Sequence, residues 1–399
     1  MRLLLCHAHY QQRGGEDHSF EDEARLLESR GHEVVRYTLH NDAINEMGRV
    51  GIAVRTVWNH RVYRELREIM ASSAPELVHF TNTFPLISPA AYYAARAEGV
   101  PVVQSLRNYR LLCPNALFLR DGLPCEDCLG KRFAMPAVKH RCYRDSRPAT
   151  AVVAGMLTVH RMMGTWSRRV GLYVTPSEFA RRKFIAGGFP EDKVAVKPNF
   201  VDPDPGEGGG TGGYAIFVGR LSSEKGIDTL LEAWLKHAPP VSLKILGDGP
   251  MAGTVRAAVD QAHGKIEWLG RQPYDQTMKL IGEAAMLVFP SLAYETFGRS
   301  VIESFAKGTP VITSDKGASA ELVENGVNGY TFPRGDAAAL AARVSQLAAQ
   351  SANMRPAARA EYLRRYTADH NYRALMTIYH RVLVQNVAET KLGERARAV

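Results

Sequence analysis

The sequence has few of the features that mark secreted, membrane-spanning or disordered proteins. Its 399 residues include only five cysteines, an odd number that favours a reducing compartment over a disulfide framework. No run of about 18 apolar residues is present, so we expect no membrane-spanning helix. The N-terminal segment has too short an apolar stretch for a secretory signal. With 45% hydrophobic and 23% charged residues, the composition is that of a globular protein, which we expect to be cytoplasmic.

Positive charge exceeds negative charge, and the excess lies in the first half of the chain. The formal net charge is +9, with 28 Lys and Arg against 20 Asp and Glu in residues 1–200, and 22 against 21 in residues 201–399. This asymmetry favours an anionic partner, although a solvated basic face would show it too. No nucleic-acid-reading module accompanies the charge, so we expect no nucleic-acid partner.

Residues 50–70 place apolar side chains between arginines, and residues 149–166 form a second apolar stretch. A basic stretch with interleaved apolar residues favours peripheral contact with an anionic membrane surface. Packing in a domain core would produce the same patterns, so both interpretations stay open at this point.

Short β-branched runs alternate with helical stretches along almost the whole chain, which is typical of parallel α/β proteins. The predicted strands are Arg2–Cys6, Glu33–Leu39, Leu77–Thr81, Val100–Ser105, Leu172–Thr175, Tyr214–Val218, Ser242–Leu246, Ile266–Leu269, Met286–Phe289 and Val311–Thr313. A Pro/Gly-rich stretch at 203–213 separates two halves and is predicted to be a linker. We therefore predict two doubly wound, Rossmann-like domains, 1–202 and 214–366, that face a shared ligand-binding cleft.

Two glycine-containing turns lie where a predicted strand leads into a helix. The first contains Gly14 and Gly15, and the second carries Arg220 and Lys225. Helix N-termini attract anions, and glycine lets a phosphate approach the backbone closely. Arg220 and Lys225 can converge on one anion across such a loop. Each turn taken alone also fits ordinary surface structure.

A carboxylate pair follows the predicted strand Met286–Phe289. Glu295 precedes a helix predicted to begin around residues 296–298, and Glu303 lies about two turns into it. Eight helical residues rise about 12 Å, more than the roughly 5–9.5 Å between the carboxylates of a glycosidase pair. The spacing instead suits the two hydroxyl-bearing ends of a long ligand whose diphosphate lies at the helix N-terminus.

Several motifs together resemble glycosyltransferase family 4. These motifs are Glu295-x7-Glu303, Gly219–Arg220 with Lys225–Gly226, Leu246–Pro250, Ala306–Val311, Val78–His79, Asn82–Leu86, Asn108–Pro114 and Cys125–Cys128. The resemblance covers essentially the whole chain. It implies a GT-B fold with an acceptor-side domain first and a nucleotide-sugar domain second, and a final helix, about 367–399, that packs back on the first domain.

The resemblance also implies roles for the motif residues. Arg220 and Lys225 would hold the donor diphosphate, Glu303 would bind the ribose hydroxyls, and Glu295 would act at the transferred sugar. The other donor contacts would come from Phe297, Gly298, Arg299, Gly14 and Gly15. The implied chemistry is transfer with retention of anomeric configuration and without a catalytic metal.

One position departs from the family pattern. A histidine usually precedes the Asn-Tyr pair, and this chain has Arg107 before Asn108. A guanidinium can stabilise a leaving phosphate but cannot relay a proton near neutral pH, so Arg107 is a candidate catalytic residue that acts electrostatically. His79 and Asn108 are candidate acceptor-side residues, and a structural histidine is the alternative at position 79.

Four of the five cysteines form a separate pattern, Cys113-x11-Cys125-x2-Cys128-x13-Cys142. A Cys-x2-Cys unit with two flanking cysteines suits tetrahedral zinc, which would stabilise a loop that is poor in apolar residues. The alternative is four reduced thiols. A structural zinc ion is thus the one metal that we expect.

These inferences predict a retaining, hexosyl-type glycosyltransferase that uses a nucleoside-diphosphate sugar and a saccharide or lipid-linked acceptor. Its expected setting is the assembly of a cell-surface polysaccharide or glycolipid, at the inner face of the membrane. A non-catalytic nucleotide-sugar sensor is the alternative. The two glutamates favour the enzyme, whereas Arg107 favours the sensor.

Overall fold

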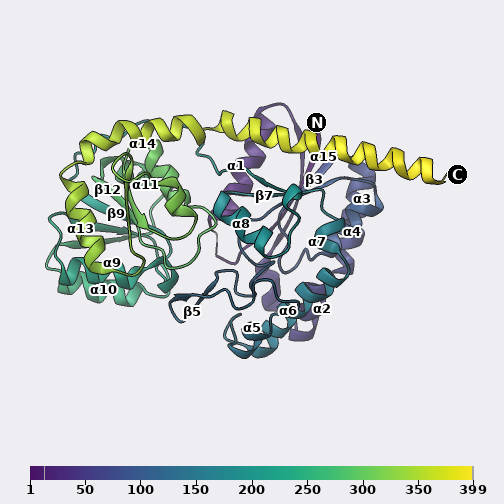
Figure 1. Cartoon of the computed structure of the whole chain (residues 1–399), viewed down its shortest axis with the longest axis horizontal. Coiled ribbons are helices and arrows are strands. Elements are labelled where there is room, and N and C mark those ends of the chain that lie inside the picture. Colours follow the sequence, from purple (N-terminus) through teal and green to yellow (C-terminus); the bar gives the residue numbers. More distant parts are fainter. Residues whose placement is uncertain (13, 398–399) are drawn as a thin grey trace. The chain divides into compact units, whose positions relative to one another are not determined.

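The structure is a computed structural model that describes residues 1–12 and 14–397, with side chains described as far as Ala388. The chain divides into two compact units, each an α/β arrangement in Figure 1. Unit 1 comprises Met1–Ala116, Glu126–Lys197 and the residues from Tyr372 onward. Unit 2 comprises Leu117–Cys125 and Pro198–Asn371.

Unit 1 contains a six-stranded parallel sheet in the order β2-β1-β3-β4-β7-β8. Its strands are β1 (Arg2–His9), β2 (Glu33–His40), β3 (Leu77–Asn82), β4 (Val102–Ser105), β7 (Leu172–Thr175) and β8 (Val194–Val196). Its helices are α1 (Gly15–Ser29), α2 (Arg49–Val57), α3 (His60–Ser73), α4 (Ala90–Ala97), α5 (Met135–Lys139), α6 (Arg147–Met162), α7 (Thr165–Arg168) and α8 (Glu178–Ala186). The residues Leu3–Cys6 of β1 are all buried, as expected for an inner strand of a parallel sheet.

Unit 2 contains a second six-stranded parallel sheet, in the order β11-β10-β9-β12-β13-β14. Its strands are β9 (Tyr214–Val218), β10 (Ser242–Leu246), β11 (Ile266–Gly270), β12 (Met286–Phe289), β13 (Val311–Ser314) and β14 (Gly329–Phe332). Its helices are α9 (Ile227–Lys236), α10 (Ala252–Gln261), α11 (Tyr274–Glu283), α12 (Arg299–Ala306), α13 (Ala337–Ala348) and α14 (Ser351–Arg365). Counted from β9, this is the strand order 3-2-1-4-5-6 of the Rossmann fold.

All ten predicted strands are present, and the fold-class prediction is confirmed. Two edge strands, β8 and β14, were not predicted, because one has three residues and the other begins with a glycine. The apolar stretch 149–166 is divided between α6 and α7. Gly164 separates them with a φ of +67°, a left-handed conformation that ends a helix.

The stretch 203–213, predicted to be a linker, is hydrogen-bonded to other parts of unit 2. The backbone N–H of Gly208 donates to the carbonyl of Lys307 (3.0 Å), and the Arg355 guanidinium donates to the carbonyl of Gly208 (2.7 Å). An ideal Cβ at Gly208 would lie 2.2 Å from the Cα of Gly282. The glycines therefore allow close packing of this stretch within unit 2.

The helix α15 (Ala368–Arg397) ends the described chain. The side chains of Leu375, Ile378, Tyr379 and Val382 lie at helical spacing and pack in the core of unit 1, with Leu3 and Leu5 of β1. The last two residues of the predicted helix, 398–399, lie outside the described residues. Within the described part of the chain, no helix is long and apolar enough to cross a bilayer.

Candidate functional site

In unit 2 the turn after β9 is hydrogen-bonded to the segment after β12. The carbonyl of Glu224 accepts from the backbone N–H groups of Leu292 (2.8 Å) and Ala293 (3.2 Å). Gly226 has a φ of +74°, and its ideal Cβ would lie 2.0 Å from the carbonyl oxygen of Pro290. Only glycine allows this approach. The two segments therefore form one surface at the strand ends, where Rossmann-like sheets bind ligands.

An ion pair lies across this junction. The ammonium of Lys225 is 2.6 Å from Oε1 of Glu295, and the Ser291 hydroxyl donates to the same oxygen (2.7 Å). The side chains of Lys225 and Glu295 are 27% and 20% exposed, so solvent and ligands reach them. Both residues were predicted to belong to the site, but their pairing was not, because it joins positions 70 residues apart.

The helix α12 begins at Arg299, later than the predicted start at residues 296–298. Glu303 therefore lies one turn into the helix, and the rise of eight helical residues does not describe its separation from Glu295. The Arg299 side chain donates from Nε to the Glu303 carboxylate (2.9 Å), so this glutamate has its own cation. The i,i+4 spacing of an arginine and a glutamate was the signal for this contact.

The remaining predicted donor residues have different environments. Arg220 is exposed at the end of β9, and we find no ion-pair partner for it among the residues that the structure describes. Phe297 is buried, and its ring contacts that of Tyr366 at 6.1 Å between centroids, so its side chain belongs to the core. Gly298 immediately precedes α12. The backbone N–H groups at this helix start are of the kind that bind anions.

In unit 1 the corresponding turn leads from β1 into α1. Gly14 directly precedes α1, and its backbone N–H donates to Oδ2 of Asp17 (2.8 Å). An added Cβ at Gly15 would meet no heavy atom within 4 Å. The open space beside Gly15 fits the predicted close approach of a ligand to this backbone.

Arg107 belongs to a buried group of charged side chains that the sequence did not reveal. Its Nη2 lies 2.7 Å from Oε2 of Glu23, which also lies 3.5 Å from the ammonium of Lys197. Burial raises the pKa of Glu23, but the charges of Lys197 and Arg107 outweigh burial and lower it to about 2. Burial lowers the pKa of Lys197 to about 8. Glu23 is thus ionised at neutral pH with two cations beside it.

His79 is fully buried, and both of its ring nitrogens have hydrogen-bond partners. These are the hydroxyls of Tyr379 in α15 (2.8 Å) and of Ser105 in β4 (2.9 Å). Burial lowers the pKa of His79 to about 4, so the ring is neutral near pH 7. This position corrects the acceptor-side assignment of His79 and supports the structural alternative, since no ring nitrogen remains for a ligand.

A small cavity, partly open to solvent, lies at the carboxyl ends of β3 and β4. Among the residues that line it are Asn82, Thr83, Phe84, Arg107, Asn108 and Arg110. The Asn108 amide donates to the half-buried carboxylate of Glu16 (3.0 Å). The guanidinium of Arg110 lies over the Phe84 ring at 4.6 Å. The cavity thus combines apolar, amide and cationic groups, as ligand pockets do.

The cysteines do not gather into a ready-made metal site. Cys125 belongs to unit 2, whereas Cys113, Cys128 and Cys142 belong to unit 1. Cys128 and Cys142 share a small hydrophobic cluster, and the Cys113 thiol donates to the side-chain oxygen of Asn115 (3.0 Å). In the described residues, no three of these sulfur atoms lie within 4.8 Å of one another. Structural zinc therefore stays a prediction.

Two family models match the chain. A glycosyl transferase 4-like domain matches residues 14–199, and glycosyl transferases group 1 matches residues 207–365. The amylovoran biosynthesis glycosyltransferase AmsK of Erwinia amylovora is 27% identical over 226 residues, which is 52% of this chain and 55% of that protein. Glycogen synthase of Mycobacterium tuberculosis is 31% identical over 188 residues, 45% of this chain and 43% of that protein. The chain thus spans about half the length of these relatives.

Solved structures show the same fold along nearly the whole chain. Alr3699/HepE of Anabaena, solved in complex with UDP, has a TM-score of 0.65 at 18% identity, covering 98% of this chain and 100% of that one. Sucrose-phosphate synthase of Thermosynechococcus elongatus has a TM-score of 0.69 at 14% identity, covering 96% and 99%. With two family models that together span most of its length, the chain belongs to the GT-B glycosyltransferases of the family 4 type.

Proposed function

We propose that this chain transfers a hexosyl group from a nucleoside-diphosphate sugar to a saccharide or lipid-linked acceptor, with retention of anomeric configuration. The proposed setting is the assembly of a cell-surface polysaccharide or glycolipid in the cytoplasm. Relatives named for amylovoran and colanic acid biosynthesis support this setting, and neighbours solved with UDP and with UDP-glucose support a nucleotide-sugar donor. The reaction as we propose it uses no catalytic metal.

The observation that carries the proposal is the ion pair of Lys225 and Glu295 at the junction of the two segments in unit 2. A diphosphate that binds Lys225 takes the place of the Glu295 carboxylate. The same exchange releases that carboxylate to accept hydrogen bonds from sugar hydroxyls. Because the pair is partly exposed, it contributes only about 0–1 kcal/mol, so the exchange costs little. Arg220 adds a second cation for the diphosphate.

The other end of the donor is assigned to Glu303. Its carboxylate is held by Arg299 one turn into α12, which orients the oxygens for two ribose hydroxyls. The backbone of Phe297 and Gly298 lies at the start of the same helix, where an anion is favoured. Gly14 and Gly15 of unit 1 are proposed to contact the donor through their backbone, as the open space at Gly15 allows.

Arg107 is proposed to stabilise the negative charge that develops on the leaving phosphate. It lines the cavity of unit 1 and is held by Glu23. A preorganised cation of this kind stabilises a transition state more than a ground state. A non-catalytic sensor is the alternative function. Sensor and enzyme differ in one measurable property, the release of nucleoside diphosphate from the donor.

Peripheral contact with an anionic membrane is proposed for the surface formed by α2 and the end of α6. The His160 ring of α6 is 2.9 Å from the carbonyl oxygen of Val57 in α2, which places the two helices side by side. Val50 and Val54 are 78% and 60% exposed, and Met162 is 83% exposed. Exposed apolar side chains on a basic segment suit the headgroup region of an anionic bilayer.

Replacing Glu303 should impair nucleotide binding, whereas replacing Glu295 should impair turnover. Glu303→Ala removes hydroxyl contacts at the ribose, which does not react, so free nucleoside diphosphate should bind about 10- to 150-fold more weakly. Glu295→Ala acts at the transferred sugar and should lower turnover strongly while free-nucleotide affinity stays nearly unchanged. Calorimetry with free nucleotide and transfer assays measure both effects. Glu232→Ala, an exposed glutamate of α9, is the control. Equal loss of nucleotide affinity in both variants would contradict the assignment.

Replacing Arg107 should change the reaction more than donor binding. We expect Arg107→Ala to lower turnover about 10²-fold or more, with a much smaller change in donor affinity. Arg107→Lys keeps the charge beside Glu23 and should retain more of the turnover. Thermal melting of each variant separates loss of fold from loss of chemistry. Unchanged turnover in a folded Arg107→Ala protein would leave Arg107 a purely structural role.

Binding to lipid should depend on the exposed valines of α2. Sedimentation with phosphatidylglycerol vesicles should show association that declines as salt rises, because the arginines contribute electrostatically. The double replacement Val50→Ser and Val54→Ser should weaken it. The matched control replaces Val384 and Val387, which are exposed on α15, by serine. Equal binding to neutral vesicles, or equal loss in the control, would reject this surface.

A structural zinc ion on the cysteines is the last component that we propose. Protein purified without added metal should contain about one zinc per chain by elemental analysis. Cys128→Ser should lose this zinc and melt at a lower temperature, whereas Cys6→Ser, in β1 and outside the pattern, should keep it. Fully reduced wild-type protein that holds no zinc would refute the proposal.

A further inference from the structure

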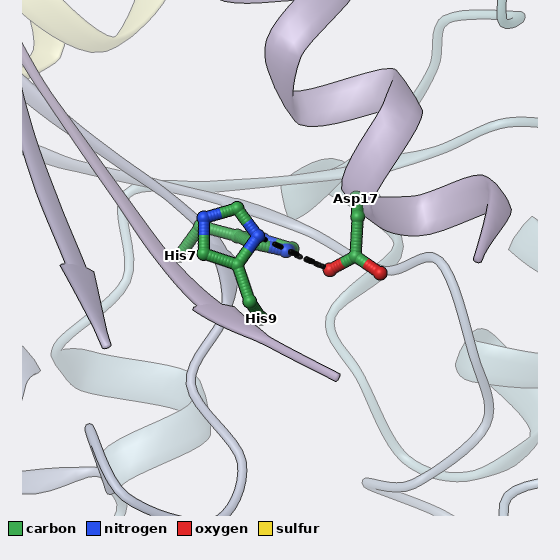
Figure 2. A group of neighbouring side chains, drawn as sticks. All are labelled: His7, His9 and Asp17. Carbon is green, nitrogen blue, oxygen red and sulfur yellow. Dashed lines mark hydrogen bonds and ion pairs between the residues drawn. The ribbon is translucent and has the colours of Figure 1, made fainter. Parts of the chain in front are cut away.

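Three side chains at the start of unit 1 converge on one point (Figure 2). They are His7 and His9 of β1 and Asp17 of α1, and one potential ligand atom from each lies within 4.8 Å of the other two. Within the described residues, no other group of three histidine, cysteine or carboxylate side chains meets this condition. None of the three has a part in the proposed transfer reaction.

The distances fit a shared cation. Nε2 of His7 lies 2.8 Å from Oδ1 of Asp17, and Nδ1 of His9 lies 3.4 Å from the same oxygen. Two ligands about 2.1 Å from one metal ion, at angles of about 90–110°, lie roughly 3.0–3.4 Å apart. Both distances to Asp17 are therefore within a few tenths of an ångström of the spacing of neighbouring metal ligands, and the two histidine nitrogens lie within 4.8 Å of each other.

The hydrogen-bond partner on the far side of His7 is compatible with a metal-binding tautomer. The Thr81 hydroxyl lies 2.8 Å from Nδ1 of His7 and 3.2 Å from the carbonyl oxygen of Cys6. When this hydroxyl donates to Cys6 it accepts from Nδ1–H, and Nε2 of the neutral imidazole then presents a lone pair toward Asp17. A cation between Nε2 and the Asp17 carboxylate would bind both groups in a contact that is fully buried.

The surroundings hold the three side chains in place. The ring of Phe20 stacks on that of His7, with centroids 4.7 Å apart, and meets that of His9 edge-on at 5.8 Å. Asp17 accepts backbone hydrogen bonds from Tyr10 and Gly14, which fix its carboxylate. Metal-binding histidines commonly donate their second ring N–H to an oxygen, and the Thr81 hydroxyl is such an oxygen beside His7. The His9 side chain is 24% exposed and provides an entry from solvent.

We propose that His7, His9 and Asp17 bind a divalent first-row transition metal ion such as Zn²⁺ or Co²⁺. Two imidazole nitrogens and one carboxylate oxygen suit these borderline ions better than Mg²⁺ or Ca²⁺, which take oxygen ligands. The site would be structural or regulatory for the turn that carries Gly14 and Gly15, because Asp17 holds the backbone of Gly14. The proposal does not depend on the proposed glycosyl transfer.

The test is Co²⁺ binding to the full chain after treatment with a chelator, measured by equilibrium dialysis with elemental analysis. Wild-type protein should bind one more equivalent of Co²⁺ than His9→Gln. His40→Gln is the matched control, since His40 stacks beside His9 but is not one of the three ligands. Any metal on the cysteines is common to all three proteins and cancels in this comparison.

A second variant tests the hydrogen bond to His7. Thr81→Val keeps the ligands and the shape but removes the acceptor, and it should weaken Co²⁺ binding about 10- to 100-fold. Melting curves recorded with chelator show whether each variant is folded. Equal Co²⁺ stoichiometry and affinity in wild-type and His9→Gln protein would overturn the proposal and leave His7 and Asp17 as a directly hydrogen-bonded pair.

Discussion

Glu23 lies in α1, and its buried carboxylate faces Arg107 beyond the end of β4 and Lys197 just after β8. Removing one partner of a buried ion pair commonly costs about 3–5 kcal/mol, because the other charge is left without compensation. The same group reaches β3 through His79, which in turn bonds to Tyr379 of α15. The position of Arg107 at the cavity wall thus depends on one carboxylate, which also lies beside the histidine that bonds to the last helix.

The charged pairs of unit 2 are of a different kind. Lys225 and Glu295 are both about a quarter exposed, and Arg299 and Glu303 are 19% and 10% exposed. Pairs that water reaches are weak and exchange readily, whereas the buried pair of Glu23 does not. The buried charges around Glu23 are therefore fixed, whereas a ligand can displace the partly exposed pair of Lys225 and Glu295. Such a difference suits the proposed donor, which must bind and leave in every cycle.

The sequence predicted the strands well because buried parallel strands are continuous apolar runs. Tyr214–Val218 and Met286–Phe289 were placed to the residue. Sequence patterns did not predict the features that depend on long-range packing. The glycines of 203–213 looked like a flexible linker, but they allow backbones to touch, which composition alone cannot distinguish. The pairing of Glu23 with Lys197 joins positions 174 residues apart, and no local pattern indicates it.

The same limit applied to the candidate site. Glu295, Glu303, Arg220 and Lys225 were identified from motifs, since each is close in sequence to a strand end or a helix start. Their partners were not identified from the sequence. The i,i+4 spacing of Arg299 and Glu303 was a local signal of such a partner. His79 lies in a family motif, but the sequence does not show that it is buried. Its structural role follows from its two hydroxyl partners.

Arg107 shows why a departure from a family pattern has to be interpreted together with its surroundings. A buried histidine is neutral near pH 7, as His79 is, and would leave Glu23 balanced by Lys197 alone. Arginine stays protonated even where it is buried, so the group of three side chains carries one carboxylate and two cations. The extra positive charge lies at the wall of the cavity that Arg107 lines. A buried neutral histidine would place no such charge there. The Glu23 carboxylate offsets the cost of burying the Arg107 guanidinium.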